Sequence, residues 1–121
     1  MYPTIGKSRT VDQIFNAIIQ VETQGLHFNR HGFVMSPKGA MGVAQVMPET
    51  LEYYNFINGT HFDTIALLDR DFNMRVGQWY WNVCKASKPN IEMAISAYNM
   101  GINNDVYNWR YVREVKGCLR N

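Results

Sequence analysis

Residues 36–48 read SPKGAMGVAQVMP, and this stretch sets the organisation of the chain. Ser36 to Gly42 forms a turn-rich loop, in which Gly39 and Gly42 let the backbone bend close to a ligand. From Val43 to Tyr54 the pattern is helical, with a kink or a restart forced by Pro48. No Gly-Lys-Ser/Thr follows the glycines, so the loop is not a phosphate cradle.

Helical periodicity continues on both sides of this loop. Before it, Thr10 and Gln13 form a capping box, an apolar stripe of helical spacing follows, and Gly25 supplies a stop. After it, we predict a turn at 58–59, a short helical turn over 64–68, a long helix over 71–86, a helix from Pro89-Asn90 to Gly101, and one or two short helices beyond. No alternation is long enough to predict a strand. The sequence therefore predicts an all-α domain of five to seven helices.

The bulk composition favours one globular domain over residues 1–121. Apolar residues make up 46% of the chain and charged residues 18%. The net charge of +2 suits an anionic wall polymer but is too small for a nucleic-acid binder. No stretch is long and apolar enough to cross a bilayer, which takes about 20 residues. The first residues lack the apolar core of a signal peptide, so we expect a removed leader or another route to the substrate.

Glu22 is the anomaly in the first helix. It lies eleven positions after Val11 and four after Ile18. At about 100° per residue, this spacing places the carboxyl group in line with the apolar stripe. Burial there disfavours the charged form and raises the pKa, which suits a general acid at neutral pH. The alternative is a Glu that turns outward to solvent or pairs with an arginine such as Arg30.

Cysteines and histidines leave smaller questions open. Cys84 and Cys118 are either two unpaired, half-buried thiols or a disulfide that ties the C-terminal tail to an earlier helix. His27 and His31 are four residues apart, but no third or fourth ligand accompanies them. We therefore expect both to be solvent-facing loop histidines and predict no metal site.

Residues 36–48 closely resemble the signature loop of the soluble lytic transglycosylases, a wall-cleaving family related in fold to goose-type lysozyme. In that family the loop follows a helix that ends in a Glu-Ser pair, matched here by Glu22-Thr23. Three further blocks are similar and fall in the same order: residues 71–80, residues 94–101 (AISAYNMG) and residues 111–115 (YVREV). The resemblance runs from about Ile14 to Val115 and implies a goose-type-lysozyme-like helical domain with a substrate cleft.

The resemblance also implies roles for individual residues. Glu22 is the catalytic residue, and Ser36, Gln45 and Met47 line the glycan cleft beside it. The hydroxyl of Tyr98 points toward the sugar or the carboxylate, and Asn99 shapes the same wall. Plainer alternatives stand beside these roles: Ser36 sets a turn, Gln45 and Met47 pack at the kink, and Tyr98 belongs to the core.

The sequence departs from the family pattern in three places. Extra residues within Gly25 to Met35 predict an additional lip over the cleft. Ala44 replaces a common Met, and Ile102-Asn103 replaces the usual Pro-Gly. These departures affect the reach and length of the cleft and leave the acid in place.

Only one carboxylate lies in a motif, whereas most glycosidases use two. The resemblance implies that the substrate supplies its own nucleophile. Glu22 protonates the bond between N-acetylmuramic acid and N-acetylglucosamine, and then takes a proton from the muramoyl C6 hydroxyl as a 1,6-anhydro ring closes. The implied partner is a peptidoglycan glycan strand, met in the periplasm or on the cell wall by a monomer that needs no cofactor. The alternatives are a lysozyme-like hydrolase and a non-catalytic glycan-binding component of a virion or secretion channel.

Overall fold

The structure, a computed structural model, describes residues 13–119. Five α-helices, one 3-10 helix and a small hairpin lie within this range: α2 (Gln13–Thr23), β1 (Phe28–Asn29), β2 (Gly32–Phe33), α3 (Pro48–Asn58), η1 (Thr64–Leu68), α4 (Arg70–Ser87), α5 (Ile91–Met100) and α6 (Trp109–Cys118). The mostly helical single domain predicted from the sequence is confirmed. The capping box involves Thr10, which lies outside the described residues.

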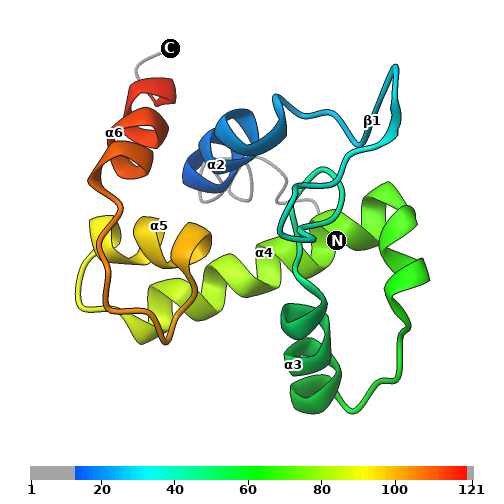
Figure 1. Ribbon diagram of the computed structural model, residues 1–121. Coiled ribbons are helices and arrows are strands. Elements are labelled where there is room, and N and C mark those ends of the chain that lie inside the picture. Colours follow the sequence, from blue (N-terminus) through cyan, green and yellow to red (C-terminus); the bar gives the residue numbers. More distant parts are fainter. Residues whose placement is uncertain (1–12, 120–121) are drawn as a thin grey trace, which may run out of the picture.

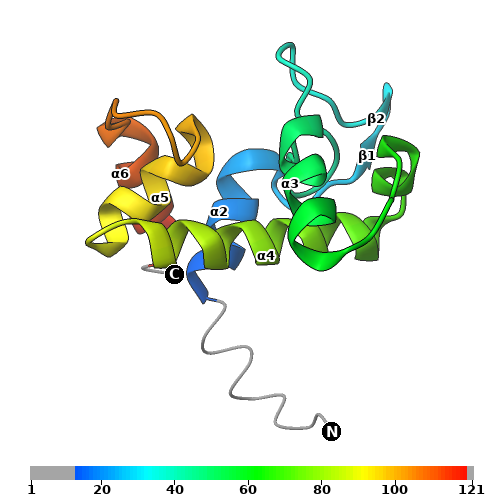
Figure 2. The ribbon, with the colours of Figure 1, turned by 90° about the horizontal axis from the view of Figure 1, so that it is seen from below.

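Helix α4 runs the length of the molecule, and the other elements are arranged along it (Figures 1 and 2). Near its start it packs on η1 and α3, and near its end it packs on α5. Helix α6 packs on both α2 and α5, so α2 and α6 are neighbours although they lie far apart in sequence. None of the helices within residues 13–119 is both long and apolar enough to cross a lipid bilayer.

Helix α3 begins later than the sequence pattern predicts. Residues 42–45 form turns, and Gln45 has a φ of 53°, which an α-helix does not accommodate. The helix starts at Pro48, whose missing N–H costs nothing in the first turn. The predicted helix from Val43 is therefore wrong in its first five residues, and Pro48 starts the helix instead of kinking it. The helices predicted over 64–68 and 71–86 are confirmed within a residue of their bounds. The helix predicted from Pro89-Asn90 to Gly101 is confirmed as α5, with Asn90 and Gly101 as its caps.

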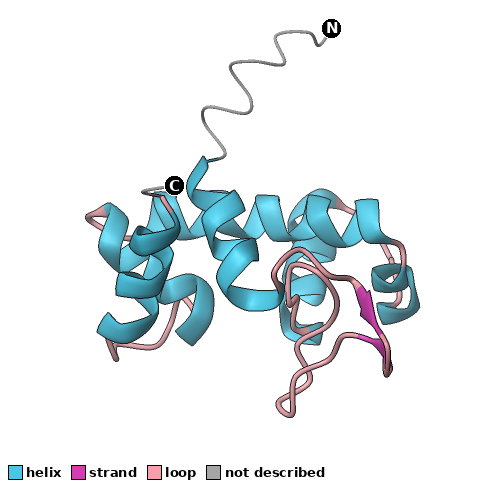
Figure 3. Ribbon diagram, turned by 90° about the horizontal axis from the view of Figure 1, so that it is seen from above, coloured by secondary structure: helices cyan, strands magenta, loops and turns pink. Residues whose placement is uncertain are grey.

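The chain between α2 and α3 contains the one sheet in the described range. Strands β1 and β2 pair antiparallel, with Phe28 opposite Phe33 (Figure 3). No strand was predicted here, because two residues are too few to show an alternating pattern. From Val34 to Met47 the chain then follows a loop held by two isolated bridges, Met35 with Met41 and Met41 with Val46.

The core lies between α2, the loop, α4, α5 and α6. Its fully buried side chains include Ile18 of α2, Trp81 of α4, Ile95 of α5 and Val115 of α6. Gly77 of α4 lies where the loop comes closest. A Cβ there would sit 2.5 Å from the Ala44 Cβ and 3.0 Å from the Tyr98 hydroxyl, so only glycine allows this approach.

Gly77→Ala is therefore expected to destabilise the protein by about 1–3 kcal/mol, because the added methyl group overpacks the contact with the loop. Gly117→Ala in α6 is the matched control. Nothing lies within 4 Å of a Cβ at that helical position, so alanine there should be neutral or stabilising by up to about 1 kcal/mol. Denaturant unfolding of both variants measures the difference. Equal stability of the two would show that the contact at Gly77 is not tight.

Candidate functional site

Buried backbone groups of the loop are held by side chains from outside it. Val43 is fully buried, and its N–H donates to Nδ1 of His27 at 3.0 Å. The carbonyl of Val43 accepts a hydrogen bond of 2.8 Å from the hydroxyl of Thr23, at the end of α2. The other ring nitrogen of His27, Nε2, lies 2.8 Å from the carbonyl of Leu68. Since Nδ1 accepts, His27 is the Nε2–H tautomer and donates to Leu68, which ties the loop to η1.

Ala44 is held in the same way by α4 and α5. Its N–H donates to Oδ1 of Asn73 at 2.9 Å, and its carbonyl accepts from the Tyr98 hydroxyl at 2.7 Å. The amide group of Asn73 also donates to the carbonyls of Met41 and Leu67, at 3.0 and 3.1 Å. Asn73 is fully buried with these three bonds. Because an unmet buried polar group costs about 1–3 kcal/mol, these contacts fix the path of the loop.

The turn between Gly42 and Gln45 requires special backbone angles. Gly42 has a φ of 75°, and a Cβ there would lie 2.2 Å from Nδ2 of Asn73. Gln45 also has a positive φ, which costs a residue other than glycine roughly 1 kcal/mol or more. Its side-chain amide donates to the carbonyl of Gly42 at 2.9 Å, which offsets part of that cost. The backbone strain lies at one of the predicted substrate-binding residues.

Glu22 lies on the last turn of α2, next to the Thr23 that holds Val43. Its side chain is half-buried, and the Tyr111 hydroxyl donates a hydrogen bond of 2.7 Å to its Oε2 atom. No hydrogen bond from residues 13–119 reaches Oε1. Burial raises the pKa of Glu22 above its usual 4.5, and the bond from Tyr111 lowers it by a smaller amount. The carboxyl group therefore holds a proton at higher pH than an exposed glutamate does.

Two tyrosines stand close to this carboxyl group. Burial raises the pKa of Tyr98 well above 10.0, and the charge of Glu22 raises it further. Burial and then the charge of Glu22 also raise the pKa of Tyr111. Both phenols therefore stay neutral and can only donate or accept hydrogen bonds. The Tyr98 hydroxyl donates to the carbonyl of Ala44 and not to the Glu22 carboxylate. Tyr98 therefore holds the loop in position.

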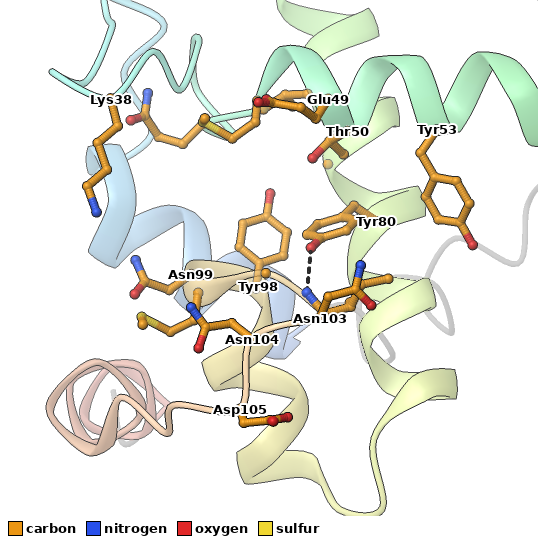
Figure 4. A pocket seen from close by; sticks show the side chains of 17 residues that line it. Lys38, Glu49, Thr50, Tyr53, Tyr80, Tyr98, Asn99, Asn103, Asn104 and Asp105 are labelled. Carbon is orange, nitrogen blue, oxygen red and sulfur yellow. Dashed lines mark hydrogen bonds between the residues drawn. The ribbon is translucent and has the colours of Figure 1, made fainter.

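A cavity of about 950 Å³ opens beside these residues, between α3, α4, α5 and the loop (Figure 4). Its lining includes Gln45, Met47, Tyr98 and Asn99, four of the five predicted substrate-binding residues. Tyr80 lies beside Tyr98 in the middle of the view, and its hydroxyl accepts a hydrogen bond of 3.2 Å from the Ile102 N–H. Charged groups in the lining come from Lys38, Glu49 and Asp105.

Glu22 and Ser36 are not among the residues that line the cavity. Glu22 is linked to the cavity through Tyr98. The Tyr98 side chain lines the cavity, and the charge of the Glu22 carboxylate raises its pKa. The hydroxyl of Ser36 accepts from the Ala40 N–H at 3.0 Å and closes the turn at the tip of the loop. The structure thus gives Ser36 the turn-setting position that the sequence left as its alternative.

The hairpin after α2 differs from the sequence-based expectation. Its residues are not among those that line the cavity, so the lip over the cleft stays a prediction. His27 was expected to face solvent, but only 5% of its surface is exposed, because it packs against Phe28 and Phe33 and holds the loop. His31 is exposed, as expected. Within residues 13–119 no group of three or more His, Cys, Asp or Glu side chains could hold a metal ion.

Both cysteines are free thiols. Cys84 is buried in α4, and burial raises its pKa to about 12. Of the two alternatives left open by the sequence, the unpaired thiols hold in this structure.

Several residues that build the site were not assigned a role from the sequence. Tyr111 belongs to the closing Tyr-Val block, and Asn73 and Gly77 have the spacing of the long-helix block, yet none pointed to a partner. Their signal is a polar or small residue on an apolar helix face, the same signal that identified Glu22. Asn73 bonds Ala44 across 29 residues and Tyr111 bonds Glu22 across 89, and only the fold brings these pairs together.

Thr23→Val is expected to lower the free energy of unfolding by about 1–3 kcal/mol, because it leaves the buried carbonyl of Val43 without a donor. Thr23→Ser keeps the hydroxyl and should retain most of that stability. Denaturant unfolding compares the two. The role of the hydroxyl would be refuted if the Ser variant lost as much stability as the Val variant.

Glu22→Gln is expected to stabilise the fold at neutral pH. The raised pKa of Glu22 means that its stabilising, protonated form is lost as pH rises through the folded pKa. The variant should therefore be more stable than the parent above that pH, and the difference should vanish well below pH 4.5. Unfolding curves across this range test the sign, with Glu52→Gln on the exposed face of α3 as the matched loss of one carboxyl group.

Comparison with known proteins agrees with this arrangement. A family model, described as "Transglycosylase SLT domain", matches residues 5–118. No curated protein matches the chain, and no solved structure matches it. The matched segment contains α2 with Glu22, the loop of residues 34–47, the long helix α4, and α6 with Tyr111. The chain therefore belongs to the Transglycosylase SLT domain family, which has a lysozyme-like fold and acts on peptidoglycan.

Proposed function

We propose that this protein is a lytic transglycosylase that cleaves the β-1,4 bond between N-acetylmuramic acid and N-acetylglucosamine, at the cell wall or in the periplasm. The observation that carries the proposal is the setting of Glu22. Its half-buried carboxyl group has a raised pKa, and Tyr98, whose pKa its charge raises, lines a cavity of sugar-binding size together with Gln45 of the strained loop. Peptidoglycan binding by the family supports the choice of substrate.

In the first step Glu22 donates its proton to the glycosidic oxygen, and the bond from that oxygen to the muramoyl C1 atom breaks. Oε2 is engaged by Tyr111, so Oε1 is the oxygen that we assign to the proton. In the second step the muramoyl C6 hydroxyl attacks C1, and the Glu22 carboxylate takes its proton. The intramolecular attack replaces water and restores the protonated acid.

A hydrolytic reaction on the same fold is the second candidate, because two further carboxylates line the cavity. Glu49 lies in the first turn of α3, and Asp105 lies in the loop between α5 and α6. Either could activate a water molecule in an inverting hydrolase, which needs a second carboxylate. The single carboxylate in the family signature favours the transglycosylase.

Mass spectrometry of the muropeptides released from purified sacculi separates the two reactions. We expect 1,6-anhydromuropeptides, whereas reducing ends would establish the hydrolase. Release of neither product by the folded protein would favour a glycan-binding component.

Glu22→Gln should reduce turnover by at least about a thousandfold while sacculus binding is retained, because the amide cannot transfer a proton. Glu52→Gln makes the same change at an exposed carboxyl group and should cleave at the parent rate. Clearing of sacculi by Glu22→Gln at the parent rate would remove Glu22 from the reaction.

A further inference from the structure

Asn108 joins the start of α6 to α5 through two hydrogen bonds and caps α6 with a third. Its backbone N–H donates to the hydroxyl of Ser96 at 2.8 Å. Its side-chain Oδ1 accepts from the N–H of Tyr111 at 3.1 Å and so caps the helix. Its Nδ2 donates to Oδ1 of Asn99 at 2.9 Å. One side chain therefore contacts both a residue of the cavity wall and the residue that holds the acid.

The third residue of α6 is the one that reaches Glu22. Tyr111 is buried, and its hydroxyl lies 2.7 Å from Oε2 of Glu22. A phenol is rigid, so the position of its hydroxyl follows the position of its own backbone. The Asn108 cap bonds to that backbone N–H, and any displacement of the first turn would therefore move the hydroxyl away from the carboxylate.

We propose that Asn108 is a positioning residue, which sets the hydrogen bond from Tyr111 to Glu22 and joins the acid to the Asn99 wall of the cavity. Its effect on cleavage rests on the proposed function above. Its effect on the protonation of Glu22 does not, because that can be measured without turnover.

The protonation of Glu22 can be measured without interference from the groups around it. The titratable groups that face it are Tyr111 from α6 and Tyr98 from α5, and these interact in turn with Cys84 and Tyr80 of α4. Burial raises the pKa of each of these groups, for Cys84 and Tyr80 to about 12, so all four are neutral near pH 7. No Lys, Arg, Asp or other Glu within the described residues shifts the pKa of Glu22. A titration between pH 4 and 9 in this cluster therefore belongs to Glu22.

The test is an NMR titration of the Glu22 side-chain carboxyl carbon in the parent and in Asn108→Ala. The bond from Tyr111 lowers the pKa of Glu22 and burial raises it, so loss of the bond should move the titration to higher pH. Tyr111→Phe should produce the same change, and Asn108→Ala should add little in that background. In the active enzyme, kcat/KM should fall roughly tenfold, and the alkaline limb of its pH profile should move to higher pH.

Two control variants separate positioning from a general loss of a helix cap. Asn90 caps α5 through the same kind of bond, from the Met93 N–H at 2.8 Å, and it is exposed. Asn90→Ala should cost similar stability and leave the Glu22 titration unchanged. Asn108→Ser keeps a capping oxygen without adding charge and should restore the parent titration.

If Asn108→Ala does not fold, Asn108→Gly provides the same measurement, because glycine is tolerated at this helix position. The proposal would be overturned if Glu22 titrated at the same pH in folded Asn108→Ala or Asn108→Gly as in the parent. It would also be overturned if Asn90→Ala shifted the Glu22 titration by the same amount as Asn108→Ala. Absence of anhydromuropeptides from the parent would refute the proposed function and leave the NMR result to decide the role of Asn108.

Discussion

The backbone of Val43 and Ala44 is buried where no secondary structure can satisfy it, and the rest of the site depends on how it is satisfied. Four polar groups of these two residues are paired with His27, Thr23, Asn73 and Tyr98. These side chains come from α2, the segment after it, α4 and α5. A loop that would otherwise be mobile becomes a rigid wall, because each partner is itself fixed by a helix or by the core.

The same arrangement explains the position of the acid. Thr23 holds the loop and Glu22 precedes it, so the carboxyl group is placed at the junction of loop and core by a contact made one residue away. Burial there disfavours the charge, and the bond from Tyr111 limits the penalty without removing it. The protein thus keeps a group that is unfavourable for folding at neutral pH, which is the usual relation between stability and a functional carboxyl group.

Much of the fold could be predicted from the sequence, because helical stripes and Gly, Pro and Asn breaks are local signals. The helix over 71–86 and the helix between Pro89-Asn90 and Gly101 followed from them. The helix from Val43 did not hold, since the buried contacts of Ala44 and the positive φ of Gln45 override the local pattern. Glu22 could be found as a candidate from its place on the apolar stripe, and Gln45, Tyr98 and Asn99 from the resemblance to the transglycosylase family. The bond to Tyr111, the burial of His27 and the turn made by Ser36 could not, because each depends on which distant segments pack together.

The two partners in the Glu22–Tyr111 hydrogen bond are 89 positions apart in the chain. Helix α6 must pack against α2 before this contact can form, so the environment of Glu22 depends on the last helix of the described range. Without α6, the Glu22 carboxyl group would lose the hydrogen bond from Tyr111 and the cover of a neighbouring helix. Under the proposed function, the competence of the acid is in this way tied to completion of the fold.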